Sequence, residues 1–210
     1  MICNNDFLKN CKGQLGDELI VTSYNGKTYL RRKPKSIRMT TAMMEQGERI
    51  SSVAALWQAM KTAGLDQAWQ QAAKGSRWTA YNVMVKNCLC AFNGKGVISD
   101  FEKLKLTIGT LQLTDHLSAK NEDNRIEIGW DGNSGVYPGS KSSDIFVIAC
   151  LKRADNFTLR IPDIDIFRRK DGHAFLRPEI LPEDFPYLYC YFRSEDGRKF
   201  SESKFLLNFN

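Results

Sequence analysis

The fold is decided by three adjoining stretches, Tyr187-Leu-Tyr-Cys-Tyr-Phe-Arg193, Glu195-Asp-Gly-Arg198 and Phe200-Ser-Glu-Ser-Lys-Phe-Leu-Leu207. Two segments rich in aromatic and apolar residues flank an Asp-Gly turn signal, which is the pattern of a β-hairpin. We expect this hairpin to close a β-sandwich. That kind of scaffold offers loops and edges and does not by itself dictate a reaction.

A two-residue alternation of apolar and polar side chains extends from this hairpin back to about residue 104. It predicts further strands near residues 104–109, 126–130, 144–151, 157–161 and 173–177. The stretch 144–151 is continuously apolar, so it predicts a central strand. Together these segments total about seven strands, the number expected of a fibronectin type III-like or immunoglobulin-like sandwich, with Trp130 and Tyr187 or Tyr189 in its core or corner.

The first half of the chain has a different pattern. Asn25-Gly26 lies between two strand-like segments and predicts a hairpin with a type I′ turn. A helix capped by Thr40 or Thr41 is expected to run to Gly64, followed by shorter helices beginning at Asp66 and after Gly75. Their large side chains are predicted to face a core: Ile50, Val53, Trp57, Met60, Trp69, Trp78 and Tyr81.

This change of period after about Phe92 predicts an α+β protein in two parts. We expect a β-hairpin and helical domain over residues 1–98, and an all-β sandwich domain over residues 99–210. No stretch resembles a membrane span or a secretory signal, so we expect a cytoplasmic protein that does not contact membranes. The six cysteines are expected to be thiols that pack as small hydrophobes.

Positive charge is concentrated near the start of the chain. Residues 1–38 contain eight Lys or Arg and three Asp or Glu, whereas residues 39–210 contain twenty-two and twenty-one. The candidate contacts for phosphate or nucleic acid are Lys27, Arg31, Arg32, Lys33, Lys35 and Arg38. Such a cluster attracts anions through a field that salt screens. The alternative is an exposed strand end whose charges only prevent edge pairing.

No catalytic, cofactor-binding or metal-binding residues are predicted. His116 and His173 lie in no recognisable motif, and Cys88 and Cys90 cannot chelate one metal on an intact helix. Asp163 and Asp165 can form an acid pair or a cation site, but simple alternation with Ile164 and Ile166 explains them equally well. We therefore expect no enzymatic activity and no cofactor.

A resemblance spans most of the chain. Its motifs are Lys12-Gly13, Leu15-Gly16, Tyr24-Asn-Gly-Lys27, Tyr29-Leu-Arg31, Pro34, Gln46, Arg49, Ala80-Tyr-Asn82, Val85-Lys-Asn87 and Trp130-Asp131. In these motifs the chain resembles the bacterial domain-of-unknown-function family 6266. The resemblance implies an N-terminal region of hairpin and helices followed by a sandwich, and it implies no activity.

Three functions compete. The favoured function is that of a non-catalytic structural or protein-interaction protein, which binds other proteins in a larger assembly or a mobile-element particle. The sequence is also compatible with a homo-oligomer. The alternative is a nucleic-acid-binding module that uses the basic hairpin with Tyr24 and Tyr29, because phosphate contacts and base stacking together bind single strands. The third is a hydrolase whose site has no sequence motif.

Overall fold

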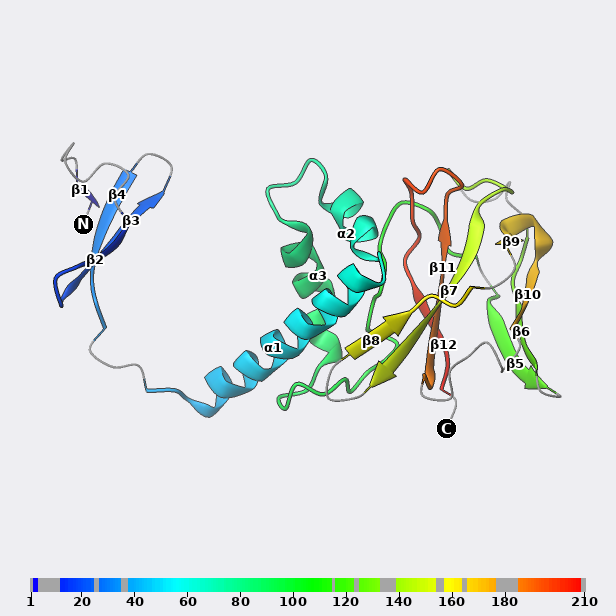
Figure 1. Ribbon diagram of the computed structural model, residues 1–210, viewed down its shortest axis with the longest axis horizontal. Coiled ribbons are helices and arrows are strands. Elements are labelled where there is room, and N and C mark those ends of the chain that lie inside the picture. The colour runs from blue at the N-terminus through cyan, green and yellow to red at the C-terminus, as the bar shows by residue number, and fades with distance from the viewer. Residues whose placement is uncertain are drawn as a thin grey trace. The chain divides into compact units, whose positions relative to one another are not determined.

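A computed structural model describes residues 2–3, 12–24, 27–34, 38–114, 116–122, 125–132, 139–153, 157–163, 166–176 and 185–208. The chain forms two compact units, unit 1 (Met1–Thr41) and unit 2 (Ala42–Asn210). Unit 1 is a small sheet, and unit 2 combines helices with two sheets (Figure 1). The chain thus has both helices and antiparallel sheets, as the α+β prediction requires.

Unit 1 is an antiparallel sheet in the order β1-β4-β3-β2. Its strands are β1 (Ile2–Cys3), β2 (Gly13–Leu15), β3 (Leu19–Tyr24) and β4 (Lys27–Arg32). The pairing of β3 with β4 runs from Leu19 opposite Arg32 to Tyr24 opposite Lys27. The predicted hairpin is therefore confirmed, while its turn residues Asn25 and Gly26 lie outside the described residues.

The helices of unit 2 are α1 (Thr41–Thr62), α2 (Asp66–Ala73) and α3 (Ala80–Cys88), and the first residue of α1 still belongs to unit 1. Two 3₁₀ turns, η2 (Leu89–Ala91) and η3 (Arg169–Asp171), complete the helical elements described. The hydroxyl of Thr79 accepts a hydrogen bond from the Asn82 amide at 3.2 Å and caps α3. Two core predictions are wrong here, since Ile50 is 42% exposed and Trp78 is 53% exposed. Trp78 precedes the cap of α3, so it lies in a loop and not on the helix stripe.

Two antiparallel sheets follow in unit 2. The first has the order β10-β6-β5, from β5 (Ser118–Glu122), β6 (Arg125–Gly129) and β10 (His173–Leu176). The second has the order β12-β11-β7-β8, with β9 also paired to β7, from β7 (Ile145–Arg153), β8 (Phe157–Arg160), β9 (Phe167–Arg168), β11 (Tyr187–Arg193) and β12 (Lys204–Asn208). The apolar strand predicted near residues 144–151 is the central strand β7, and the closing hairpin is β11–β12.

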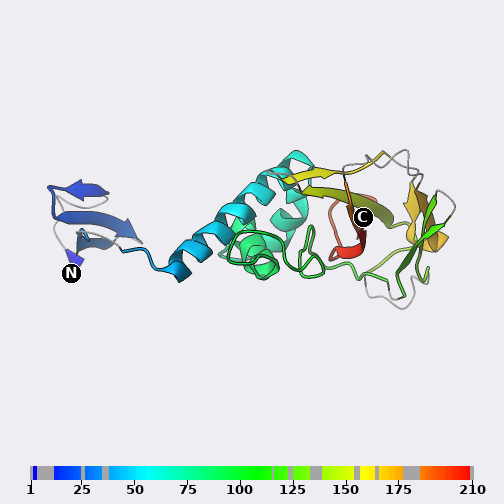
Figure 2. The ribbon, with the colours of Figure 1, turned by 90° about the horizontal axis from the view of Figure 1, so that it is seen from below.

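The five-stranded sheet is covered on both faces, by the helices on one side and by the three-stranded sheet on the other (Figure 2). Alternate residues of β7 divide between these two cores. Val147, Ala149 and Leu151 lie in the core shared with the helices, while Ile148 and Cys150 lie in the core between the sheets. A strand buried on both faces explains why this stretch of sequence is continuously apolar.

The segment that follows the helices joins all these layers. Trp69 Nε1 donates to the Leu106 carbonyl at 2.9 Å, and Leu106 N donates to Ser203 Oγ at 2.7 Å. Residues 104–109 form no strand, contrary to the prediction, because both backbone groups of Leu106 bond to these side chains and not to the backbone of a neighbouring strand. A Cβ on Gly109 would lie 2.1 Å from the Phe200 carbonyl oxygen, so this close approach requires glycine.

These contacts explain where the chain divides. The helices share a core with the five-stranded sheet, so no boundary falls between residues 98 and 99. The division follows Thr41, and it separates the N-terminal sheet from the helices that we expected in the same domain. The difference arises because sequence period distinguishes helix from strand but carries no information on which elements bury their faces together.

Candidate nucleic-acid interface

The register of β3 and β4 places both tyrosines of unit 1 on one face of its sheet. Tyr24 lies opposite Lys27, and Tyr29 lies opposite Thr22. Residues directly opposite each other share a face, as do alternate residues along a strand. We call this face the tyrosine face, and it carries Gln14, Ile20, Thr22, Tyr24, Lys27, Tyr29 and Arg31.

The rings and cations of the tyrosine face are open to solvent. Tyr24 is 69% exposed and Tyr29 is 37% exposed. Lys27 and Arg31 flank Tyr29 along β4 at two-residue spacing, about 7 Å on each side. Lys33 follows the strand, and its Nζ donates to Gln14 Oε1 at 3.1 Å on the same face. Among the described residues, no carboxylate forms an ion pair with these three cations.

The opposite face of this sheet is packed only in part, because Leu15 and Leu19 on it are exposed. Val21 and Thr28 are buried, and the hydroxyls of Ser23 and Thr28 lie 3.3 Å apart. Arg32 belongs to this face, and its guanidinium lies 3.8 Å from the Glu18 carboxylate. Two consecutive arginines of β4 therefore have different settings, because Arg31 faces the tyrosines and Arg32 faces an acid.

The structure thus separates the six basic residues expected to bind anions. Lys27, Arg31 and Lys33 gather on the tyrosine face, and Arg32 lies on the other face. Arg38 is exposed in the segment before α1, and Lys35 lies outside the described residues. Composition identified the cluster, but only strand pairing distinguishes the two faces.

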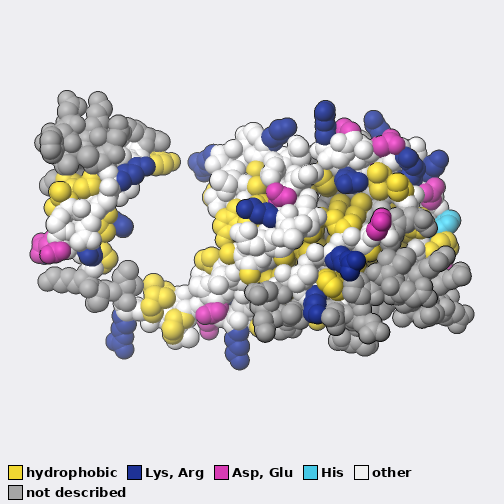
Figure 3. Space-filling model, viewed as in Figure 1, with side chains coloured by type: hydrophobic (Ala, Val, Ile, Leu, Met, Phe, Trp, Pro, Cys, Tyr) yellow, Lys and Arg dark blue, Asp and Glu magenta, His cyan; other side chains and the backbone are white. Residues whose placement is uncertain are grey.

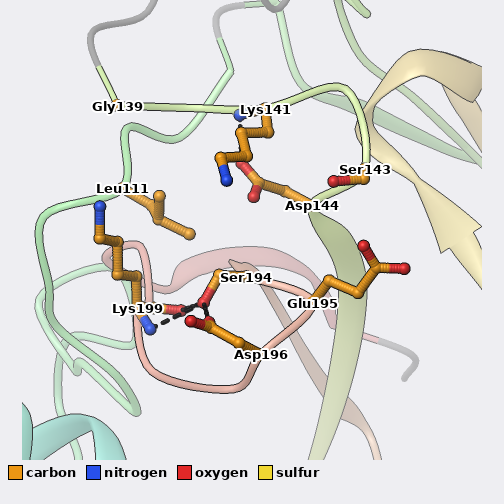
Figure 4. A pocket seen from close by; sticks show the side chains of 9 residues that line it. All are labelled: Leu111, Gly139, Lys141, Ser143, Asp144, Ser194, Glu195, Asp196 and Lys199. Carbon is orange, nitrogen blue, oxygen red and sulfur yellow. Dashed lines mark hydrogen bonds between the residues drawn. The ribbon is translucent and has the colours of Figure 1, made fainter.

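Unit 2 has a depression of about 370 Å³ at one end of its sheets, and most of the residues that line it are polar (Figure 4). Its lining includes Lys141, Asp144, Ser194, Asp196 and Lys199. The acids here already have partners: Asp196 Oδ1 accepts from Ser194 Oγ at 2.6 Å and from Arg198 N at 3.1 Å, which lowers the pKa of its carboxyl. The acidic residues of this depression therefore stabilise the loops that carry them.

A buried ion pair stands beneath that depression. Arg169 Nε lies 3.3 Å from Asp144 Oδ2, and both side chains are essentially inaccessible to solvent. The guanidinium also donates to the Gln112 carbonyl at 2.9 Å and lies 4.0 Å from the centre of the Phe192 ring. Trp130, buried as predicted, donates from Nε1 to the Arg169 carbonyl at 2.9 Å. This network fixes one end of the sheets of unit 2.

The groups that sequence analysis considered for chemistry are dispersed. His116 and His173 are exposed, and Asp165 lies outside the described residues. Burial raises the pKa of Cys88 and Cys150 to about 12, so both thiols stay protonated near neutral pH. The buried hydroxyl of Ser201 has a structural role, because its Oγ accepts from Phe192 N at 2.8 Å and donates to the Glu202 carbonyl at 3.0 Å. Within the described part of the chain, no group of three or more His, Cys, Asp or Glu is arranged to hold a metal.

Comparisons of the chain with protein-family models, with curated proteins and with solved structures give no match. No helix in the described ranges has the length and apolar character that crossing a bilayer requires. The exposed rings and cations of the tyrosine face are therefore the feature of the molecule that bears on its function.

Proposed function

We propose that this protein is a non-catalytic binding protein whose unit 1 binds single-stranded nucleic acid on the tyrosine face. One observation carries the proposal: Tyr24, Tyr29, Lys27 and Arg31 share an exposed face, with no carboxylate of the described residues paired to either cation. Exposed rings stack on unpaired bases, and cations beside them neutralise the phosphates. Only bases that are free of a partner strand offer their faces to a ring in this way.

The same observation weighs against a face whose charges only keep an edge soluble. Charges of that kind serve equally well beside apolar or polar neighbours. Here the alternation along β4 places a ring between two cations and directs the remaining arginine of the strand to an acid on the other face. This combination supports ligand binding over simple solvation.

The test compares the two consecutive arginines in the full chain. Anisotropy of a labelled oligothymidine measures affinity across a salt series, and Arg31→Gln is matched against Arg32→Gln. We expect Arg31→Gln to weaken binding several-fold and to reduce the slope of log affinity against log salt by about 0.7. Arg32→Gln should change affinity less than about twofold, because its side chain faces away from the tyrosines.

The tyrosines provide the second arm of this test. Tyr24→Ala and Tyr29→Ala should each cost about 1–3 kcal/mol of binding to the oligothymidine. Binding to inorganic polyphosphate, which has no bases, should be unchanged in both variants. Equal effects of the two arginine variants, or tyrosine variants that bind the oligonucleotide normally, would refute base recognition by this face.

A structural protein of a larger assembly, which the sequence favours, is the second candidate. The first half of α1 exposes Met43 (44%), Met44 (51%) and Ile50 (42%), which is unusual for large apolar side chains on one short stretch of helix. If this stretch binds a partner protein, Ile50→Asp should abolish co-purification of that partner from the native cell. The oligonucleotide affinity of the same variant should stay unchanged.

We also infer that the two sheets of unit 2 form an immunoglobulin-like or fibronectin type III-like sandwich. The order β5-β6-β10 corresponds to strands A, B and E of that fold, and β7-β11-β12 to strands C, F and G. Tyr189 does not act as a corner residue within the sandwich, because its hydroxyl donates to the Phe101 carbonyl at 2.9 Å in the joining segment. Membership of family 6266, a cytoplasmic location and the absence of enzymatic activity stay predictions.

A further inference from the structure

The basic residues of unit 2 are not evenly spread. Between Asp66 and Asp100 the sequence contains no Asp or Glu, while Lys74, Arg77, Lys86 and Lys95 lie in this interval. The interval covers most of α2 and all of α3, and dark-blue Lys and Arg side chains are seen over these helices in Figure 3. A local excess of positive charge therefore exists in unit 2, although residues 39–210 as a whole are nearly balanced.

The same region exposes an indole ring. Trp78 is 53% exposed, whereas Trp57, Trp69 and Trp130 are at most 8% exposed. Trp78 lies in the loop between α2 and α3, with the Arg77 guanidinium carbon 5.9 Å from its ring centre. Trp has the largest apolar surface of any side chain, so leaving it in water forgoes a large burial gain.

The backbone at Trp78 belongs to an ordered loop. Ser76 Oγ accepts from Trp78 N at 3.1 Å and donates to the Trp78 carbonyl at 3.3 Å. Thr79 then caps α3, which fixes where the helix begins. On α3, the side chains of Asn82 and Lys86 are exposed, and their four-residue spacing places these two on one side of the helix.

We call the exposed cations, indole and amide of residues 74–86 the Trp78 surface. Its members are Lys74, Arg77, Trp78, Asn82 and Lys86. Among the described residues, no carboxylate is ion-paired with its three cations. The chemistry matches that of the tyrosine face: an open ring beside unpaired cations.

We propose that the Trp78 surface is a second contact for single-stranded nucleic acid, on which Trp78 stacks with a base while Arg77 and Lys86 neutralise phosphates. This inference rests on the proposed function of unit 1, because the two surfaces present the same chemistry and belong to one chain. A strand long enough to reach both surfaces binds more tightly than either surface alone allows, since the second contact then forms at high effective concentration. A partner protein with an acid-rimmed pocket and an anionic membrane are the competing occupants.

The test uses the full chain and its own fluorescence. Because Trp78 is the exposed one of the four tryptophans, stacking of a base on it should quench the solvent-exposed part of the emission. We expect an oligothymidine of about 30 residues to quench it, and inorganic polyphosphate not to. Trp78→Ala should abolish the quenching and weaken oligothymidine binding at least about fivefold, while Trp78→Phe should retain most of the affinity.

A matched pair of lysines separates a local contact from general charge. Lys86→Gln should weaken oligothymidine binding several-fold, whereas Lys120→Gln, on the exposed side of β5, should leave it unchanged. If Trp78→Ala and Lys86→Gln bind normally while Arg31→Gln is impaired, the inference fails and the function of unit 1 stands. If only the Trp78 surface responds, the inference stands and the tyrosine face fails. If no oligonucleotide binds, or if Trp78→Ala impairs only binding to anionic lipid vesicles, the inference is overturned.

Discussion

Tyrosines occupy opposite settings in the two units. In unit 2, Tyr189 and Tyr191 are buried, and burial raises the pKa of Tyr191 to about 12. In unit 1, Tyr24 and Tyr29 lie on an exposed face beside cations. Since both pairs lie on antiparallel strands, the strand itself does not decide which role the ring takes. The layer that covers the strand decides it.

This contrast extends to the arginines. Arg169 of unit 2 is enclosed with Asp144, whereas Arg31 of unit 1 stands in solvent without a carboxylate partner among the described residues. Side chains that stabilise a fold by burial and pairing, such as Arg169, cannot also contact a ligand in solution. Binding residues should therefore be exposed residues that contribute little to the stability of the fold. Three predictions test this contrast between buried and exposed side chains.

The largest effect is expected from Arg169→Ala. It leaves Asp144 buried without its charge partner, which costs about 3–5 kcal/mol of unfolding free energy. Arg31→Ala should cost less than about 0.5 kcal/mol, since an exposed substitution removes little packing. All four tryptophans belong to unit 2, so denaturation followed by Trp fluorescence measures the Arg169 variant, and calorimetric melting of the full chain measures the Arg31 variant in unit 1. Similar losses in the two variants would contradict the contrast between the units.

An intermediate effect is expected at alkaline pH. Burial raises the pKa of Cys150 from 9.0 to about 12, so the folded chain keeps a proton that the unfolded chain releases above pH 9. The stabilisation from this thiol is complete below pH 9 and is lost as the pH rises toward 12, by about 1.4 kcal/mol per pH unit.

Denaturation measured between pH 8 and about 11 would check this slope. Cys150→Ala should make the loss of stability with pH shallower by one proton. Val147→Ala, a truncation on the other face of β7 with no titratable group, should lower stability at every pH and leave the slope intact. A Cys150→Ala slope equal to the original would show that this thiol does not titrate as the burial argument requires.

The smallest effect is expected from Glu18→Gln. The Arg32–Glu18 pair spans 3.8 Å with both side chains 71% exposed, so its loss should change stability by less than about 0.5 kcal/mol. Removing an acid from unit 1 should also strengthen oligothymidine binding slightly, by less than about threefold. Calorimetric melting and anisotropy would measure the two outcomes, and weaker binding would contradict an electrostatic contribution.

Much of the secondary structure could be predicted, for identifiable reasons. The continuous apolar run of β7 and the Asn-Gly signal between β3 and β4 each specify a local conformation. At residues 104–109 the alternation predicted a strand wrongly, because side chains distant in sequence, Trp69 and Ser203, bond to the backbone of Leu106 where a strand would bond to a neighbouring strand. The prediction that Trp78 faces the core was wrong because Thr79 caps α3, which leaves Trp78 in the loop before the helix.

The candidate site could be predicted only in part. The charge count located the basic cluster in the first 38 residues, but it could not tell Arg31 from Arg32, because their difference arises from pairing with β3. The acid-free interval from residue 67 to residue 99 was likewise present in the sequence. Its significance depends on the exposure of Trp78, which is a property of packing.

The sequence by itself determined which segments become helix or strand and where positive charge accumulates, because period, turn residues and charge act over a few neighbouring positions. Tertiary structure alone decided that the helices join the sheets of unit 2, that the chain divides after Thr41, and which rings stay in solvent. Those outcomes depend on contacts between residues far apart in the chain, such as Leu106 with Ser203, and no local pattern encodes them.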